Sequence, residues 1–205
     1  MTSSAPRLVV LAGPSGSGKS HLARQLAREL GLAVLRLDDF YRDGDDPALP
    51  RAFGVVDWDD PASWDADAAV AAVLTLVTDG AATVPTYDIA TSRATGSTRL
   101  VVGDTSVVLA EGIFAADVVP RLREHGVLAD ALALTHPPAV TFARRLARDL
   151  REGRKPPLTL VRRGWRLMRS EPAIVAHQTS MGAVPCTKAV ARQRVRALAA
   201  QASAR

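Results

Sequence analysis

The 205-residue sequence is poor in cysteine, in aromatic residues and in long apolar runs. A single cysteine, Cys186, excludes an internal disulfide and is typical of a protein that works in a reducing compartment. No apolar run approaches the roughly 20 residues of a membrane span. The N-terminal segment also has too short an apolar run for a signal peptide. These absences predict a cytoplasmic protein that does not act at a membrane.

The remaining composition is that of a globular protein. Apolar residues make up 47% of the chain and charged residues 23%, which excludes the highly charged composition of a disordered chain. A length of 205 residues suits one domain of the larger kind with a core of its own. We therefore expect a single domain that spans residues 1–205.

Charge is distributed unevenly along the chain. Residues 1–135 carry 11 basic and 18 acidic residues, whereas residues 136–205 carry 15 basic and 3 acidic ones. A basic C-terminal third of this kind is typical of a nucleic-acid-binding surface or of a cationic cover that closes over a polyphosphate. Composition leaves both interpretations open.

The segment GPSGSGKS, residues 13–20, favours the polyphosphate. An apolar run of strand length, residues 7–13, leads into it, and Leu22, Leu26 and Leu30 recur at helical spacing after it. Gly-x-x-x-x-Gly-Lys-Ser between a strand and a helix is the phosphate-binding loop pattern. Glycines leave the backbone N–H groups free to surround an anion, and the helix N-terminus adds partial positive charge.

This loop predicts an ATP or GTP site. Lys19 is expected to reach the β- and γ-phosphates, and the Ser20 hydroxyl to bind Mg²⁺. The bare pattern arises by chance in on the order of one per cent of chains of this length, and the flanking strand and helix make a chance match rarer. The expected nucleotide-binding residues are Gly13, Pro14, Ser15, Gly16, Ser17, Gly18, Lys19 and Ser20.

Apolar strands alternate with amphipathic helices along the chain, which predicts a three-layer α/β fold around a parallel sheet of about five strands. Near the C-terminus, residues 182–186 suggest a Gly-x-x-Pro-Cys turn rather than a strand, and a basic amphipathic helix follows them. The other expected elements are strands at 32–37, 106–114 and 129–135, a helix at 65–77 and a helix that begins at Pro137.

Acidic residues at the ends of two predicted strands are candidates for the chemistry. Asp38 directly follows the second strand, where open α/β sheets bind ligands, and its carboxylate would accept or orient the proton of an attacking hydroxyl. Asp39 is the nearest alternative for that role. Glu111 is a lone acid in an apolar strand, and burying it is costly unless it meets a cation or a hydrogen-bond network, which favours a role beside a metal.

The helix expected to begin at Pro137 also carries a stripe of arginines along one side: Arg144, Arg148 and Arg151. The excess of arginine over lysine and the lack of acidic partners favour phosphate contact over a solvated helix face.

Residues 7–172 resemble the uridine kinase family of P-loop phosphotransferases, within the phosphoribulokinase/uridine kinase group. The resemblance implies a P-loop fold like that of nucleoside monophosphate kinases, ATP and Mg²⁺ as cofactors, and a basic lid at about residues 151–172. It rests on the phosphate loop and on the segments LDDFYR (37–42), VDWDDPASWD (56–65), VPTYDIATSR (84–93), VVLAEGIF (107–114) and ARRLARDLREGR (143–154).

The resemblance also implies roles for single residues. Asp38 falls on the position that faces the substrate hydroxyl, Glu111 on the position that assists the metal, and Arg148 and Arg154 on lid positions for catalysis and ATP binding. The implied substrate-binding residues besides Asp38 are Tyr41, Trp58, Asp59, Tyr87, Arg93 and Arg145.

One departure from the family concerns the acceptor. Uridine kinases carry a pyrimidine-contacting histidine two residues before the arginine that matches Arg93, and here Thr91 stands in its place. We therefore expect an ATP-dependent phosphotransferase acting on a hydroxyl of a small molecule, first a nucleoside such as uridine or cytidine. The alternatives are a kinase for pantothenate, nicotinamide riboside, a sugar or a polyol, or a non-kinase P-loop protein that binds nucleic acid or regulates. We expect no nucleic-acid partner, and a homo-oligomer is left open.

Overall fold

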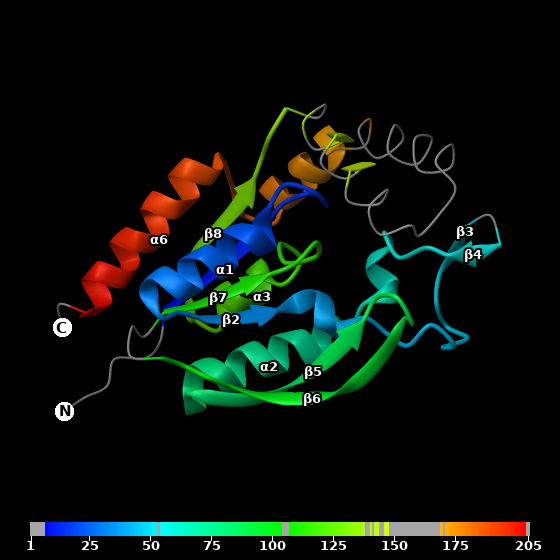
Figure 1. Ribbon diagram of the computed structural model, residues 1–205, viewed down its shortest axis with the longest axis horizontal. Helices are drawn as coiled ribbons and strands as arrows, with labels where there is room; N and C mark the ends of the chain where they lie inside the picture. Colours follow the sequence, from blue (N-terminus) through cyan, green and yellow to red (C-terminus); the bar gives the residue numbers. More distant parts are fainter. Residues whose placement is uncertain are drawn as a thin grey trace.

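The computed structural model describes residues 7–52, 54–103, 107–137, 140, 142–143, 146–147, 169 and 171–203. A five-stranded sheet in the order β2-β7-β1-β8-β9 lies at its centre, and all of its strand pairs are parallel (Figure 1). The expectation of a three-layer α/β fold with about five parallel strands is confirmed. The strands are β1 (Arg7–Ala12), β2 (Ala33–Arg36), β7 (Val107–Glu111), β8 (Leu128–Leu134) and β9 (Val184–Cys186).

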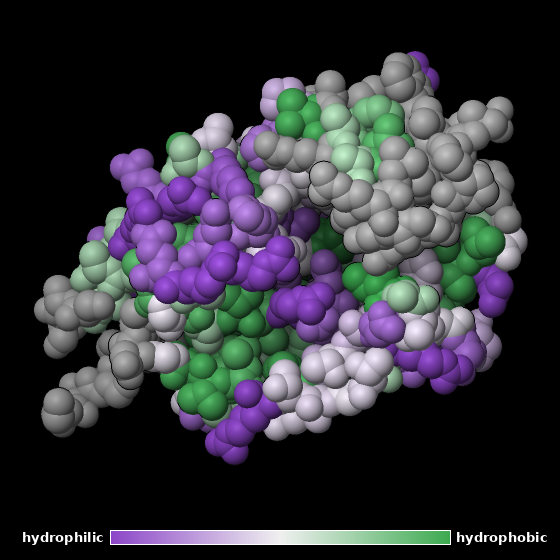
Figure 2. All heavy atoms as spheres, in the orientation of Figure 1, coloured by the Kyte–Doolittle hydropathy of each residue, from purple (hydrophilic) through white to green (hydrophobic). Residues whose placement is uncertain are grey.

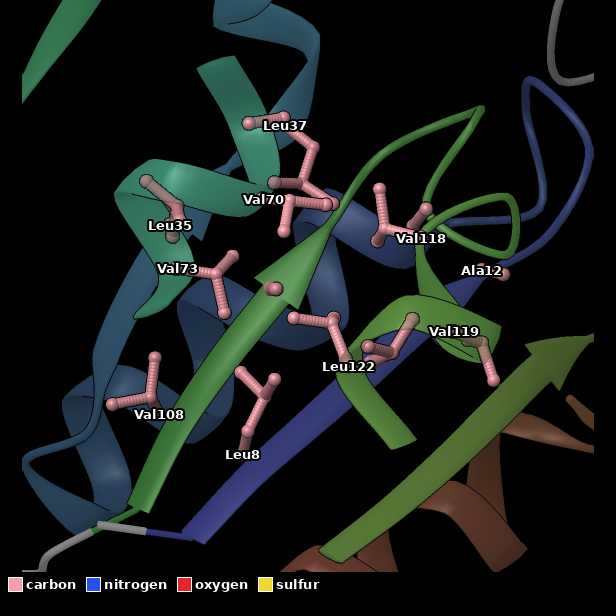
Figure 3. Packing of buried hydrophobic residues seen from close by; sticks show 14 of the residues in the cluster. Leu8, Ala12, Leu35, Leu37, Val70, Val73, Val108, Val118, Val119 and Leu122 are labelled. Atoms are coloured by element: carbon pink, nitrogen blue, oxygen red, sulfur yellow. The ribbon is translucent and has the colours of Figure 1, made fainter. Parts of the chain in front are cut away.

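Apolar side chains cover both faces of the central strands because alternate residues of a strand point to opposite faces. On one face, Leu8 and Val108 pack against α2 (Ala66–Asp79) and α3 (Val119–Glu124), as Figure 3 shows. On the other face, Val9 and Leu109 belong to a cluster with residues of α1 (Lys19–Leu30) and α6 (Lys188–Ser203). The two clusters fix the sheet between its helical layers.

Local signals explain where the helices begin and end. Asp65 caps α2, since its side chain accepts a hydrogen bond from the backbone N–H of Ala68 at 2.9 Å. Gly31 ends α1 in the left-handed conformation, with φ of 66°. Arg194 of α6 donates two hydrogen bonds to Asp130 of β8, at 2.8 and 2.9 Å, and so ties the C-terminal helix to the sheet. Residues 171–180 are also helical.

Two antiparallel hairpins stand outside the central sheet. The first is β3 (Arg51–Ala52) with β4 (Val55–Val56), and the second is the long hairpin of β5 (Ala81–Asp88) and β6 (Arg93–Val101). Short 3-10 helices η1 (Leu37–Phe40) and η2 (Pro61–Ser63) lie between the strands and α2. Neither hairpin was among the elements expected from the sequence.

The C-terminal part of the sheet corrects one expectation. Residues 184–186 form the strand β9, parallel to β8, where the sequence suggested a turn. A proline is tolerated there because β9 is an edge strand with a single neighbour, so the missing N–H of Pro185 leaves no inner ladder bond unmade. Among the described residues, no helix is long and apolar enough to cross a bilayer.

The two-sided core predicts a large cost for a cavity in β7. Leu109 is 0% exposed, and we expect Leu109→Ala to lower the free energy of unfolding by about 2 to 5 kcal/mol, as large-to-small core substitutions do. Val101→Ala is the control, because Val101 lies on β6 and is 58% exposed, and its effect should stay within about 0.5 kcal/mol. Urea unfolding of both variants measures the difference, and equal stabilities would contradict the described core.

Candidate active site

The phosphate loop joins the end of β1 to the start of α1. Gly13, Gly16 and Gly18 have φ of 145°, 86° and 89°, conformations that residues with a side chain rarely adopt. A Cβ on Gly13 would lie 2.8 Å from the backbone oxygen of Leu134 and from Oγ of Ser17. The loop is therefore built from small residues because its backbone turns sharply and packs closely against the end of β8.

Positive charge gathers on this loop. The ammonium of Lys19 is buried and donates to the backbone oxygens of Gly13 and Pro14, at 2.8 and 3.3 Å. No side chain caps α1 at Gly18 and its first turn holds no acidic residue, so its first N–H groups and the positive end of the helix dipole are available to an anion. Figure 2 shows a hollow in the surface at this end of α1.

A buried carboxylate lies beside the loop. Glu111 continues the alternation of Val107 and Leu109 and so points to the α1 face of the sheet, where it is 2% exposed. The Ser20 hydroxyl donates to Oε2 of Glu111 at 3.1 Å. Burial and then the neighbouring Asp38 carboxylate raise the pKa of Glu111, while Lys19, the Ser20 hydroxyl and Arg36 lower it. The buried acid expected from the sequence thus meets both a cation and a hydrogen-bond donor.

These oxygens suit a hard cation such as Mg²⁺. The Ser20 hydroxyl and the Glu111 carboxylate both lie at the phosphate loop, and Mg²⁺ is usually held by one or two carboxylates together with substrate phosphates and water. In the part of the chain that the structure describes, no group of three or more His, Cys, Asp or Glu side chains could hold a metal. The donor set therefore fits a cation that binds together with a nucleotide.

Asp38 reaches the same edge of the sheet from β2. The parallel register places Arg36 of β2 beside Glu111 of β7, so both strands end together. Asp38 follows in η1, and its Oδ1 accepts a hydrogen bond from the backbone N–H of Ile113 at 2.8 Å. A Cβ on Gly112 would lie only 2.9 Å from that oxygen. The glycine after Glu111 therefore leaves room for the Asp38 carboxylate.

Asp39 has different partners. Its carboxylate lies 3.3 Å from the Arg36 guanidinium and is largely buried. Burial raises the pKa of Asp39, as Asp38 does more weakly, while Arg36 and a backbone hydrogen bond from Tyr87 lower it. Asp38 influences the pKa of Glu111, and Asp39 is not among the groups that do so. The hydrogen bond from Ile113 thus holds the Asp38 carboxylate beside the residues that follow Glu111, whereas the Asp39 carboxylate pairs with Arg36.

An aromatic cluster adjoins η1. The Tyr41 ring lies 5.6 Å from Trp58 in an edge-to-face arrangement and 6.0 Å from both Tyr87 and Phe114. The Tyr41 hydroxyl donates to the Trp58 backbone oxygen at 3.1 Å, and the Tyr87 hydroxyl to the Arg42 backbone oxygen at 3.0 Å. Burial and then Asp43 raise the pKa of Tyr87 to about 12. Both tyrosines therefore stabilise neighbouring backbone segments through their hydroxyls and contribute their rings to the aromatic cluster.

Other residues implied by the family resemblance lie at the rim. Arg93 forms an ion pair with Asp45 in which both side chains are exposed, and Asp59 is exposed. Thr91, in place of the family histidine, donates to the Asp88 carboxylate at 3.0 Å within the hairpin turn. Most of the predicted lid, residues 151–172, lies outside the described residues. The same holds for the three arginines that the resemblance places at or near the lid: Arg145, Arg148 and Arg154.

The structure thus brings Lys19, Ser20, Asp38 and Glu111 to one edge of the sheet. Trp64 was not among the predicted site residues; it is buried and donates from Nε1 to the Leu37 backbone oxygen at 2.6 Å. The Trp64 ring also lies 5.7 Å from that of Phe114 and so packs against the aromatic cluster. Aromatic residues make up only 4% of the chain, so the presence of Trp64 six residues after Trp58 could have indicated its role in this cluster.

Comparisons with known proteins agree with this fold. Solved structures with a similar fold include a protein from Silicibacter sp. TM1040, provisionally named a fructose transport system kinase, with 24% identity, a TM-score of 0.64 and coverage of 84% of this chain and 85% of that one. D-glycerate 3-kinase from Cryptococcus neoformans is similar at 16% identity and a TM-score of 0.55, over 83% of this chain and 78% of that one. At these identities the likeness shows the fold alone.

Sequence comparison is more specific. A uridine kinase from Schizosaccharomyces pombe is 31% identical over 150 residues, which cover 70% of this chain and 32% of that protein. The chain spans about a third of the length of the curated relatives that it matches. Residues 8–156, including the phosphate loop, Asp38 and Glu111, match the Phosphoribulokinase / Uridine kinase family. The chain belongs to this family of ATP-dependent kinases that act on small molecules.

Proposed function

We propose that this protein transfers the γ-phosphoryl group of ATP, bound with Mg²⁺, to a hydroxyl of a small uncharged acceptor, most readily a nucleoside. The observation that carries the proposal is the meeting of Asp38 and Glu111 with the phosphate loop at one edge of the sheet. The uridine kinase relative supports a nucleoside as the first acceptor to test.

In this proposal, the backbone of the phosphate loop and Lys19 bind the triphosphate. Phosphoryl transfer passes through a loose transition state with charge on the γ-phosphoryl oxygens, so positioning and charge neutralisation provide most of the catalysis. The Ser20 hydroxyl and Glu111 would hold Mg²⁺, which neutralises phosphate charge when bound. Asp38, fixed by the Ile113 N–H, would orient the acceptor hydroxyl and accept its proton.

Charges on the acceptor side favour an uncharged acceptor. The arginines Arg36, Arg42 and Arg93 of this side each lie within ion-pair distance of an aspartate: Asp39, Asp46 and Asp45, respectively. A carboxylate acceptor that bound any of these three arginines would have to break its ion pair and would also approach Asp38. A neutral ring has no such cost, and the aromatic cluster of Tyr41 and Trp58 adjoins Asp38 as an apolar surface for it.

A sugar or polyol is the second candidate acceptor. Thr91 stands where uridine kinases carry their pyrimidine-contacting histidine, and its hydroxyl is bound to Asp88. A site without that contact loses one reason to prefer a pyrimidine, and a hydroxyl-rich neutral acceptor satisfies the charge argument equally well. A regulatory or nucleic-acid-binding function, by contrast, would not explain the presence of Asp38 and the aromatic cluster beside the phosphate loop.

The nucleotide site is tested by thermal unfolding. At a hundredfold excess over its Kd, Mg·ATP should raise the Tm of the wild-type protein by about 5 °C or more. Lys19→Ala and Ser20→Ala should lose most of that shift, whereas Ser97→Ala, on the exposed strand β6, should keep it. The phosphate-loop assignment fails if both loop variants keep the full shift.

The role of Asp38 is tested against its neighbour. Asp38→Asn keeps the shape of the side chain but removes the proton acceptor, so kcat should fall by about 100-fold or more while the Kd for ATP stays nearly unchanged. Asp39→Asn is the matched control, because Asp39 is paired with Arg36, and it should lower kcat far less. Steady-state kinetics on the best acceptor compare the two, and the opposite order would assign the reaction to Asp39.

The charge of the acceptor is tested with a panel of alcohols. We expect phosphorylation of uridine, cytidine or a neutral sugar or polyol, with kcat/KM at least about 10-fold above that for glycerate, shikimate or pantothenate, since each carboxylate must desolvate near Asp38. The measurement couples ADP release to a spectrophotometric readout. A carboxylate as the best acceptor would refute the neutral-acceptor argument but leave the kinase assignment intact.

A further inference from the structure

A second lysine lies at the phosphate loop, from the far end of the sequence. Lys188 is the first residue of α6 and directly follows β9 and Thr187. Because β9 runs parallel to the other strands, its end lies at the same edge of the sheet as the loop. The Lys188 ammonium lies 3.9 Å from the position that a Cβ on Gly18 would occupy. Its charge therefore stands over the last glycine of the loop.

The two lysines serve different ends of the loop. Lys19 folds back to the backbone oxygens of Gly13 and Pro14, at the start of the loop, whereas Lys188 lies at Gly18, where α1 begins. The whole chain has 3 lysines among its 26 basic residues, so the presence of two of them at one loop is notable. A lysine ammonium is a compact point charge, whereas an arginine presents a broad planar fork.

The neighbourhood of Lys188 is positively charged. Figure 1 shows α6 beside α1, and Figure 2 shows hydrophilic side chains gathered over α1. Lys188 is the largest influence that lowers the pKa of His21, ahead of burial and of Arg24, Arg28 and Arg192. Like charges held this close attract an anion to the loop at the start of both helices.

The strand order gives the direction in which a nucleotide must lie. Asp38 and Glu111 stand at the ends of β2 and β7, on one side of β1, while Lys188 follows β9, on the other side. The transferred phosphoryl group must face Asp38, so the rest of the nucleotide runs from the loop toward β8 and β9. The phosphate nearest to the ribose therefore comes closest to Lys188.

We propose that Lys188 is a second phosphate-binding lysine, whose ammonium binds the α-phosphate of the nucleotide while Lys19 binds the phosphates nearer the transferred group. This inference rests on the proposed function, because it requires that the loop bind ATP. It adds a residue from the basic C-terminal third, beyond the segment that matches the family.

A nucleotide series tests the inference. Isothermal titration should show that Lys188→Met weakens the binding of ATP, ADP and AMP by a common factor of about 10, the scale of one charge-assisted hydrogen bond, because all three carry the α-phosphate. Adenosine, which lacks phosphate, should bind Lys188→Met and the wild type equally in a competition assay. Lys188→Arg should keep most of the affinity because it keeps the charge.

The control is Arg196→Met, on the same helix but farther from the loop, where Arg196 is paired with Glu29 at 2.6 Å. It should change each affinity by less than about twofold. If Lys188→Met fails to fold, Lys188→Gln replaces it, and the Tm of the unliganded variant reports whether the fold is kept.

The outcomes separate this inference from the proposed function. Wild-type protein that binds no ATP overturns both. Wild-type protein that binds ATP, together with a Lys188→Met variant that binds all four ligands as tightly, overturns the role of Lys188 alone. An equal loss for adenosine would also overturn it, because the lysine would then act on the nucleoside. A loss of affinity confined to ATP would overturn the assignment of Lys188 to the α-phosphate, because ADP and AMP carry that phosphate too.

Discussion

The parallel register of β2, β7 and β1 is the constraint on which the candidate site depends. Leu11 of β1 and Arg36 of β2 both lie opposite Glu111 of β7, so the three strands end together and the chain segments that follow them meet. A shift of one residue in β7 would turn Glu111 to the opposite face of the sheet, away from Ser20. The apolar clusters on both faces resist such a shift, because it would also turn Val107 and Leu109 out of their packing. The hydrophobic pattern of a strand thus sets the position of the Glu111 carboxylate.

Burying that carboxylate costs free energy, and its neighbours offset only part of that cost. Glu111 is nearly inaccessible to water, and the Asp38 carboxylate adds repulsion, whereas Lys19 and the Ser20 hydroxyl favour its charged form. A divalent cation bound between these oxygens and a nucleotide would offset the repulsion that remains. Asp38 takes a backbone N–H as its partner, and this hydrogen bond fixes the carboxylate while leaving its second oxygen open to an acceptor.

Local sequence was enough to predict the phosphate loop, the burial of Glu111 and the place of Asp38, because each depends on a strand and the residues directly after it. The β5–β6 hairpin was not predicted as a whole, since β6 is exposed along most of its length and lacks the apolar alternation that marks a strand, although β5 places Ala82 and Val84 in the core. Strand β9 was missed because it is 3 residues long and contains a proline, and only its pairing with β8 makes it a strand. The position of Lys188 beside Gly18 depends on that same pairing, 170 residues along the chain, so no local pattern could have predicted it.

The acidic and basic parts of the sequence lie on different sides of the candidate site. Acidic residues of the first 135 positions collect around η1 and the hairpins, where most of them cap turns or pair with arginines, as Asp43, Asp45 and Asp88 do. Basic residues of α6 come instead to the side of α1 and the loop. An acceptor that enters between Asp38 and the aromatic cluster therefore meets groups that are already neutralised, whereas a nucleotide meets positive charge. In the proposed function the two substrates approach opposite sides of β1, so each would be selected by the charge of its own side, and the Asp38 carboxylate would repel a polyphosphate from the acceptor site.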